Sequence, residues 1–153
     1  MANAMYTRGI SKIMDGTLNL DTATLKVMLV DSGYTFDKDH DFISSGAGTP
    51  GGEELSGTGY TAGFGGAGRK TLANTAVAID DTNNRAELDG DDVTWTAINA
   101  GTAAAAIIVV EVTNDTDSYL VAYIDTASPA FPIFTNGGDV TIQWSAEGII
   151  QGT

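Results

Sequence analysis

Residues 139–145 alternate between apolar and polar side chains, and this period constrains the fold more than any other feature of the chain. The valine, isoleucine and tryptophan of the segment share one face of an extended strand, and its threonine, glutamine and serine share the other. The same period recurs at residues 93–97. Strands of this kind pack on a core with one face and meet water with the other. They predict a mainly β protein, either an antiparallel β-sandwich or a jelly-roll-like barrel.

Short turn signals separate several further strand-like segments. Residues 81–84 read Asp-Thr-Asn-Asn between two such segments and predict a hairpin. The run Ile-Ile-Val-Val at 107–110 is apolar on both faces, which predicts either a central strand covered on both sides or an interface strand. Strands are expected over residues 24–30, 75–80, 85–88, 93–98, 103–112, 119–124 and 139–145.

The N-terminal segment has a helical rather than an extended pattern. Tyr6, Ile10, Ile13 and Met14 fall at positions i, i+4, i+7 and i+8, which places them on one stripe of a helix. Gly16 suits the position just after a helix end. A short amphipathic helix is therefore predicted over residues 4–15. Its apolar stripe either packs on the protein's own sheet or docks onto a neighbouring subunit.

Glycine dominates residues 46–68, and so many glycines make regular structure costly because each loses much backbone entropy on ordering. Long loops in compact domains are usually functional or disordered. Tyr60 and Phe64 distinguish this segment from a simple linker. A surface loop is expected within the domain, ordered through these two aromatic side chains or through a partner.

Composition limits the class of protein. The 153 residues suffice for a single domain, taken as residues 1–153, with one core. A formal net charge of −13 repels phosphate backbones and argues against nucleic-acid binding. The chain has no cysteine, so disulfides and thiolate metal sites are excluded. We find neither an apolar run of membrane-spanning length nor a secretory signal pattern, and no membrane partner is expected.

Two glycine motifs resemble nucleotide-binding loops only in their letters. Residues 63–68 match the dinucleotide pattern G-x-G-x-x-G, but no strand precedes them and residues 71–79 read as a strand rather than a helix. The helix N-terminus that would hold a pyrophosphate is therefore missing. Arg69 likewise breaks the Gly-Lys pair that a phosphate loop requires. No cofactor is expected.

Candidate reactive groups have simpler explanations. His40, the single histidine, lies in a polar Asp-His-Asp segment, and no Gly-x-Ser-x-Gly elbow accompanies it. Glu87 alternates with apolar neighbours and is expected on a wet face. The acidic turns 89–92 and 114–117 could offer oxygen ligands to calcium, but turn hydrogen bonding explains both. Neither catalytic residues nor a metal site is assigned, and the chain is interpreted as non-enzymatic.

Several segments, in their order and spacing, resemble a family of small bacteriophage virion proteins encoded among head and tail genes. The chain departs from that pattern in an insertion at 46–52 and in the alanine run 103–106. The resembling segments are 13–16, 25–30 with 34–35, 54–61, 85–95 and 141–149.

The resemblance implies a capsid decoration (cement) protein that binds and stabilises the shell of the major capsid protein. Its location would be the outer capsid surface of the virion, after synthesis in the host cytoplasm. A homo-oligomer on a symmetry axis is expected, and a trimer is the specific prediction. The alternative is a tail or fibre component that binds host-surface carbohydrate through Tyr34, Tyr60 and Phe64. The expected partner-binding residues are Tyr6, Ile10, Ile13, Met14, Tyr60 and Phe64.

Overall fold

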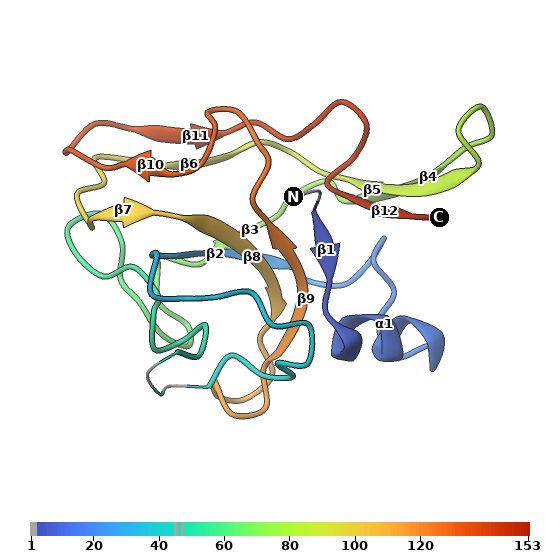
Figure 1. Cartoon of the computed structure of the whole chain (residues 1–153), viewed down its shortest axis with the longest axis horizontal. Coiled ribbons are helices and arrows are strands. Elements are labelled where there is room, and N and C mark those ends of the chain that lie inside the picture. The colour runs from blue at the N-terminus through green and yellow to red at the C-terminus, as the bar shows by residue number, and fades with distance from the viewer. Residues whose placement is uncertain (1–2, 45, 47) are drawn as a thin grey trace.

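A five-stranded antiparallel sheet lies at the centre of the computed structural model, which describes residues 3–44, 46 and 48–153 (Figure 1). Residue 47 of the predicted 46–68 loop is outside the described residues. The strand order is β1-β9-β8-β2-β3. The strands are β1 (Ala4–Met5), β2 (Lys26–Val30), β3 (Lys70–Thr71), β8 (Ala105–Val110) and β9 (Tyr119–Ile124).

Three smaller antiparallel sheets accompany the central one. Strands β6, β10 and β11 lie along one side of it, and β4, β5 and β12 extend that layer toward a hairpin that projects from the body (Figure 1). The pairs are β6 with β11, β7 with β10, and the three-stranded β12-β5-β4. Their bounds are β4 (Ala76–Asp80), β5 (Arg85–Asp89), β6 (Val93–Trp95), β7 (Thr102–Ala103), β10 (Ile133–Phe134), β11 (Val140–Ile142) and β12 (Ile150–Gly152).

The central sheet is buried on both faces. Alternate residues of β2 enter different cores: Val27 and Leu29 join a large cluster with Trp95, whereas Met28 joins a second cluster with Tyr34. Residues of β8 also alternate between the two clusters: Ile108 joins the first, and Ile107 joins the second. Each fully buried aliphatic side chain contributes about 1.5–3 kcal/mol, so both clusters stabilise the sheet. Of the two alternatives for residues 107–110, the structure shows the central strand covered on both faces: residues 107–109 are buried and Val110 is half-buried.

The predicted strands are confirmed, most of them with shorter bounds; the strand at 119–124 has the predicted bounds, and the one at 85–88 extends to Asp89. The hairpin at 81–84 joins β4 to β5, and in β11 the inward Ile142 is buried while Thr141 between the two apolar residues is exposed. The mainly antiparallel β class with one short helix is confirmed.

None of the helical segments within the described ranges has the length and apolar character needed to cross a membrane.

The helix α1 (Thr7–Met14) is shorter than the predicted 4–15. Ala4 and Met5 instead pair with Tyr123 and Ala122 as strand β1, because this pairing satisfies backbone groups along the edge of β9. The helix then packs on β9 through Gly9, its buried residue. Gly16 follows the C-cap residue, as predicted.

Gly9 sets how closely α1 approaches the sheet. A Cβ added at this position would lie 2.8 Å from the Cα and from the carbonyl oxygen of Val121, both of them backbone atoms that cannot rotate away. The helix therefore tolerates glycine at its centre, although glycine there is about 1 kcal/mol less favourable than alanine. The predicted apolar stripe did not include Gly9, because glycine has no side chain to mark it as a residue that faces the sheet.

We predict that Gly9→Ala destabilises the protein by about 1–3 kcal/mol, because overpacking against Val121 outweighs the gain in helix propensity. Urea denaturation followed by circular dichroism measures the change. Ser11→Ala, at an exposed position of the same helix, is the control and should stay within about 0.5 kcal/mol of the wild type. A Gly9→Ala variant more stable than the wild type would contradict the close approach.

Candidate functional site

Two of the residues expected to bind a partner belong to the core. Tyr6 is fully buried, and its hydroxyl lies 2.8 Å from that of Tyr34. Tyr60 is 1% exposed, and its ring stacks on Trp95 with centroids 6.5 Å apart. Burial raises the pKa of both tyrosines, so their hydroxyls stay neutral. Their placement at a partner surface is therefore corrected, because burying these large rings stabilises this chain itself.

The other four predicted residues remain accessible in different degrees. Ile10 and Ile13 are half-buried, Met14 is 82% exposed and Phe64 is 44% exposed. The three helix residues lie together along one groove, whereas Phe64 lies in the glycine-rich segment. The predicted stripe therefore grouped Ile10, Ile13 and Met14 as the structure does. Phe64, which was assigned to the same partner-binding set, lies on a separate surface.

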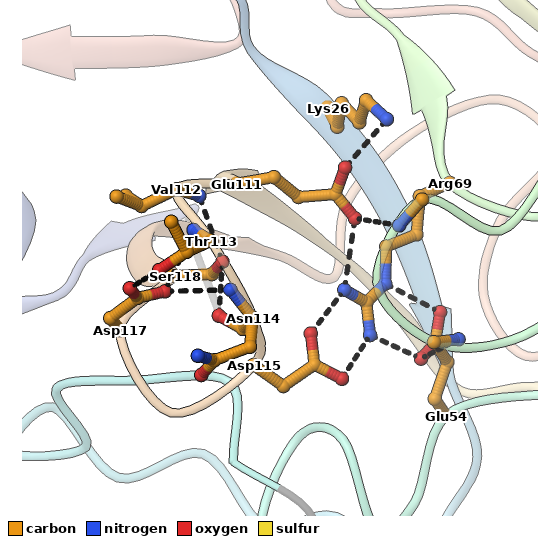
Figure 2. A network of polar contacts seen from close by, with 12 residues as sticks. Lys26, Glu54, Arg69, Glu111, Val112, Thr113, Asn114, Asp115, Asp117 and Ser118 are labelled. Atoms are coloured by element: carbon orange, nitrogen blue, oxygen red, sulfur yellow. Dashed lines mark hydrogen bonds and ion pairs between the residues drawn. The ribbon is translucent and has the colours of Figure 1, made fainter.

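A buried arginine organises the glycine-rich segment. The Arg69 side chain has no exposed surface, and its guanidinium contacts three carboxylates from distant parts of the chain (Figure 2). Its Nε and Nη2 donate to the two oxygens of Glu54 at 2.9 and 2.6 Å. Its Nη1 and Nη2 donate to Asp115 at 2.6 and 3.0 Å, and Nη1 also reaches Glu111 at 3.1 Å.

Two of these carboxylates, Glu54 and Glu111, also bind other groups. Glu111 accepts from Lys26 of β2 at 2.6 Å. Burial raises the pKa of the Glu111 carboxyl, but hydrogen bonds from Lys26, Gly65 and Arg69 outweigh burial and hold this pKa below its usual range. Desolvation likewise opposes the charge of Arg69, yet its bonds to Glu54 and Asp115 keep its pKa above the ordinary value. Glu111 and Arg69 are therefore both held in their charged forms.

The same carboxylates hold the backbone of the loop. Gly63 N–H donates to Glu54 at 3.0 Å, and Gly65 N–H donates to Glu111 at 3.1 Å. The Tyr60 hydroxyl donates to Glu54 at 3.1 Å and accepts from the backbone of Leu29. The loop is therefore ordered within the chain by an aromatic ring and by charge. Our prediction named the ring but missed the charges.

Glycine is required where the loop passes under this ring. A Cβ at Gly68 would lie 2.4 Å from two ring carbons of Tyr60. The carbonyl of Gly68 accepts from Trp95 Nε1 at 2.6 Å, which fixes the backbone on the other side. The residues after Gly68 continue into β3 rather than into a helix, as expected from the failed nucleotide-binding context.

The network leaves an apolar side chain exposed on the loop. Phe64, which is 44% exposed, precedes Gly65, whose N–H donates to Glu111. We call Phe64 and the loop backbone around it the loop surface. Val112, which follows Glu111 and is 51% exposed, points away from the network (Figure 2). Because Arg69 anchors both Glu111 and Glu54, the loop surface is ordered without a partner.

A second surface is a groove of about 640 Å³ between α1 and the β12-β5-β4 sheet, which we call the α1–β4 groove. Ile10, Ile13 and Met14 line the helix side. Val77, Leu88 and Ile150 line the sheet side, where the strand register places them on one face. An open, largely apolar groove of this kind is an expected place for binding.

The acidic turns and the histidine are held by internal contacts. Asp117 accepts from the backbone of Thr113 and Asn114, and Asp115 binds Arg69, so turn bonding accounts for 114–117. His40 is half-buried, with its Nδ1 3.1 Å from the Tyr34 hydroxyl. Glu87 pairs with Arg85 at 2.6 Å. Within the described ranges, no three His, Asp or Glu side chains are grouped so that they could hold a metal ion.

We predict that Arg69→Met destabilises the fold by about 3–5 kcal/mol, because it leaves the carboxylates of Glu54 and Asp115 without their cation and Glu111 with Lys26 alone. Chemical denaturation measures the change. Arg8→Met is the matched control: its ion pair with Asp41 is partly exposed, so we expect a change of about 1 kcal/mol or less. Equal effects from the two variants would show that the network does not stabilise the chain.

The candidate site thus consists of two surfaces, the loop surface and the α1–β4 groove, built on one rigid β framework. They share no residues, and different parts of the sequence supply them. Searches against protein-family models, curated proteins and solved structures find no match to this chain.

Proposed function

We propose that this chain is a non-enzymatic bacteriophage capsid decoration protein, which binds the outer surface of the shell and stabilises contacts between major capsid protein subunits. One observation supports the proposal most strongly: apolar side chains are exposed on two separate surfaces of the chain. Phe64 belongs to the loop surface, whereas Met14 and Val77 line the α1–β4 groove and Ile79 is exposed on the same strand face as Val77. Exposed apolar groups are typical of interaction sites, and two such surfaces suit a protein that bridges subunits.

The framework between the surfaces suits such a role. The loop surface is ordered by buried charges before any partner arrives, which lowers the entropy lost on binding. The net charge of −13 keeps the free protein soluble until it reaches the shell. The converging acids do not form an open reactive cleft, because they surround Arg69, whose side chain has no exposed surface.

Three finer assignments belong to this proposal. The small sheets on one side of the central sheet favour an antiparallel β-sandwich or jelly-roll-like arrangement. The assembly is a homotrimer, because closed symmetry lets identical copies occupy a symmetry axis of the shell. The protein is made in the host cytoplasm and then joins the virion surface.

The carbohydrate-binding alternative is not favoured by the geometry. It required Tyr34, Tyr60 and Phe64 as stacking platforms. Tyr34 is 5% exposed and Tyr60 is 1% exposed, so only Phe64 offers a ring to solvent. Stacking needs an accessible ring face, and a single half-exposed phenylalanine does not form a groove.

We predict that Phe64→Ser lowers occupancy on purified capsids at least tenfold, because it removes the largest apolar group of the loop surface from the contact. Occupancy is measured by quantitative gel analysis after the particles are separated from free protein. Phe134→Ser changes an equally apolar, more exposed side chain outside both surfaces and should keep wild-type occupancy.

Deleting residues 1–16 would be a poor test of the same proposal. That segment contains the buried Tyr6 and the close contact of Gly9 with β9, so its loss would disrupt folding. Point changes at exposed positions separate binding from folding. Failure of the wild-type protein to bind capsids, or wild-type occupancy by Phe64→Ser, would contradict the proposal.

A further inference from the structure

Strand β4 has a free edge and exposed apolar side chains. Within the described residues, β4 pairs with β5 alone, whereas β5 also pairs with β12 on its other side. Its first four residues are all exposed and apolar, and Ile79 is 79% exposed. Proteins usually protect such edges with charges, proline or covering segments, because an open edge accepts another strand. The projecting hairpin of Figure 1 therefore presents a site for strand addition.

The backbone of β4 supports this interpretation. Val77 N–H points away from β5 and donates to the Asp21 carboxylate at 2.5 Å. In an antiparallel pair, alternate residues direct their N–H and C=O groups to the same edge. Ile79 therefore also directs its peptide groups outward, beyond the stretch that Asp21 covers. The half of β4 nearest the hairpin tip is the part open to a new strand.

The α1–β4 groove lies under the same face. Val77 and Ile79 pair with Leu88 and Ala86, so these side chains share one apolar face of the sheet. The helix residues Ile13 and Met14 line the opposite side of the groove. A strand added beside the open half of β4 would place every second side chain on this face, where apolar groups would cover Ile79 and extend toward the groove.

Charge selects the kind of segment. Asp21, Asp80 and Asp81 lie along this edge and at its tip. The neighbouring cation, Arg85, already pairs with Asp80, Glu87 and Glu147. The edge is therefore acidic, and the same acidic edge of a second copy would be repelled by it. Lysine or arginine on the incoming segment would complement it.

We propose that the free edge of β4 and the α1–β4 groove together bind an extended segment of another protein, which is apolar at alternate positions and carries lysine or arginine. The segment adds as a strand beside Ile79 and buries its apolar side chains against Val77, Met14 and Ile13. This inference goes beyond the capsid role, because it concerns any protein segment with this pattern of side chains, whether or not that protein belongs to a capsid.

The test uses the full chain and two synthetic ten-residue peptides with alternating valine and threonine, one flanked by lysines and the other by glutamates. Methyl and amide resonances are followed by NMR during titration. We expect the lysine peptide to shift the Ile79 amide and the Met14 methyl, with an affinity that falls as salt rises. The glutamate peptide should bind at least tenfold more weakly.

Two variants make the test specific. Ile79→Lys places a positive charge on the edge and should weaken binding of the lysine peptide at least tenfold, whereas Val112→Lys, the same kind of change at an exposed position after β8, should not. Both positions are exposed, and the amide spectra establish that each variant is folded. No shift with the lysine peptide, or equal binding by Ile79→Lys, would overturn the proposal. Sedimentation showing wild-type dimers that Ile79→Lys dissolves would also overturn it, in favour of a second copy.

Capsid binding by the same variants keeps the two proposals apart. Loss of peptide binding in Ile79→Lys supports the strand-addition site even if the protein binds no capsid at all. Capsid occupancy that depends on Phe64, together with no peptide binding, would overturn this inference and leave the capsid role intact.

Discussion

The ion pairs of Arg69 are the interaction on which the candidate site depends. A guanidinium without exposed surface joins Glu54, Glu111 and Asp115, which lie far apart in the sequence. A buried charge is tolerated only when it is paired and fully hydrogen-bonded, so these contacts must form together or not at all. Through them the glycine-rich loop, the β8–β9 connection and strand β2 become one rigid unit. The exposed position of Phe64 follows from this anchoring.

The two faces of the central sheet explain the rest of the architecture. One face packs on the layer that contains β6 and β11, and the other is covered by the chain around Tyr34 and Ile43. With its middle strands covered on both sides, the sheet has little apolar surface left for a partner. Exposed apolar groups instead occur at the periphery, among them Phe64 of the loop surface, Val77 and Ile79 of β4, and Phe134. This arrangement separates the parts that stabilise the chain from those that can bind.

Local patterns in the sequence were enough for the strands, the hairpin and the helix, because two-residue and helical periods depend on near neighbours. The placement of Tyr6 and Tyr60 was wrong for a related reason: the sequence around an aromatic residue in a helix or loop does not show whether its ring packs on the protein's own core or faces a partner.

Arg69 could be interpreted from the sequence only as a departure from a phosphate loop, since its carboxylate partners lie 15, 42 and 46 residues away. An arginine between glycines and a strand was the one available signal. Strand β4 was predicted, but its position at the edge of a sheet was not, because the order of strands in a sheet depends on contacts between distant segments.

Amide hydrogen exchange of Gly63 and Gly65 in the isolated chain tests the central claim most directly, because their N–H groups donate to Glu54 and Glu111 of the Arg69 network. If buried charge fixes the loop before any partner binds, both amides exchange at least a hundredfold more slowly than those of an unstructured glycine segment. Exchange of both amides at the unstructured rate would contradict a loop surface that is ordered by the chain itself.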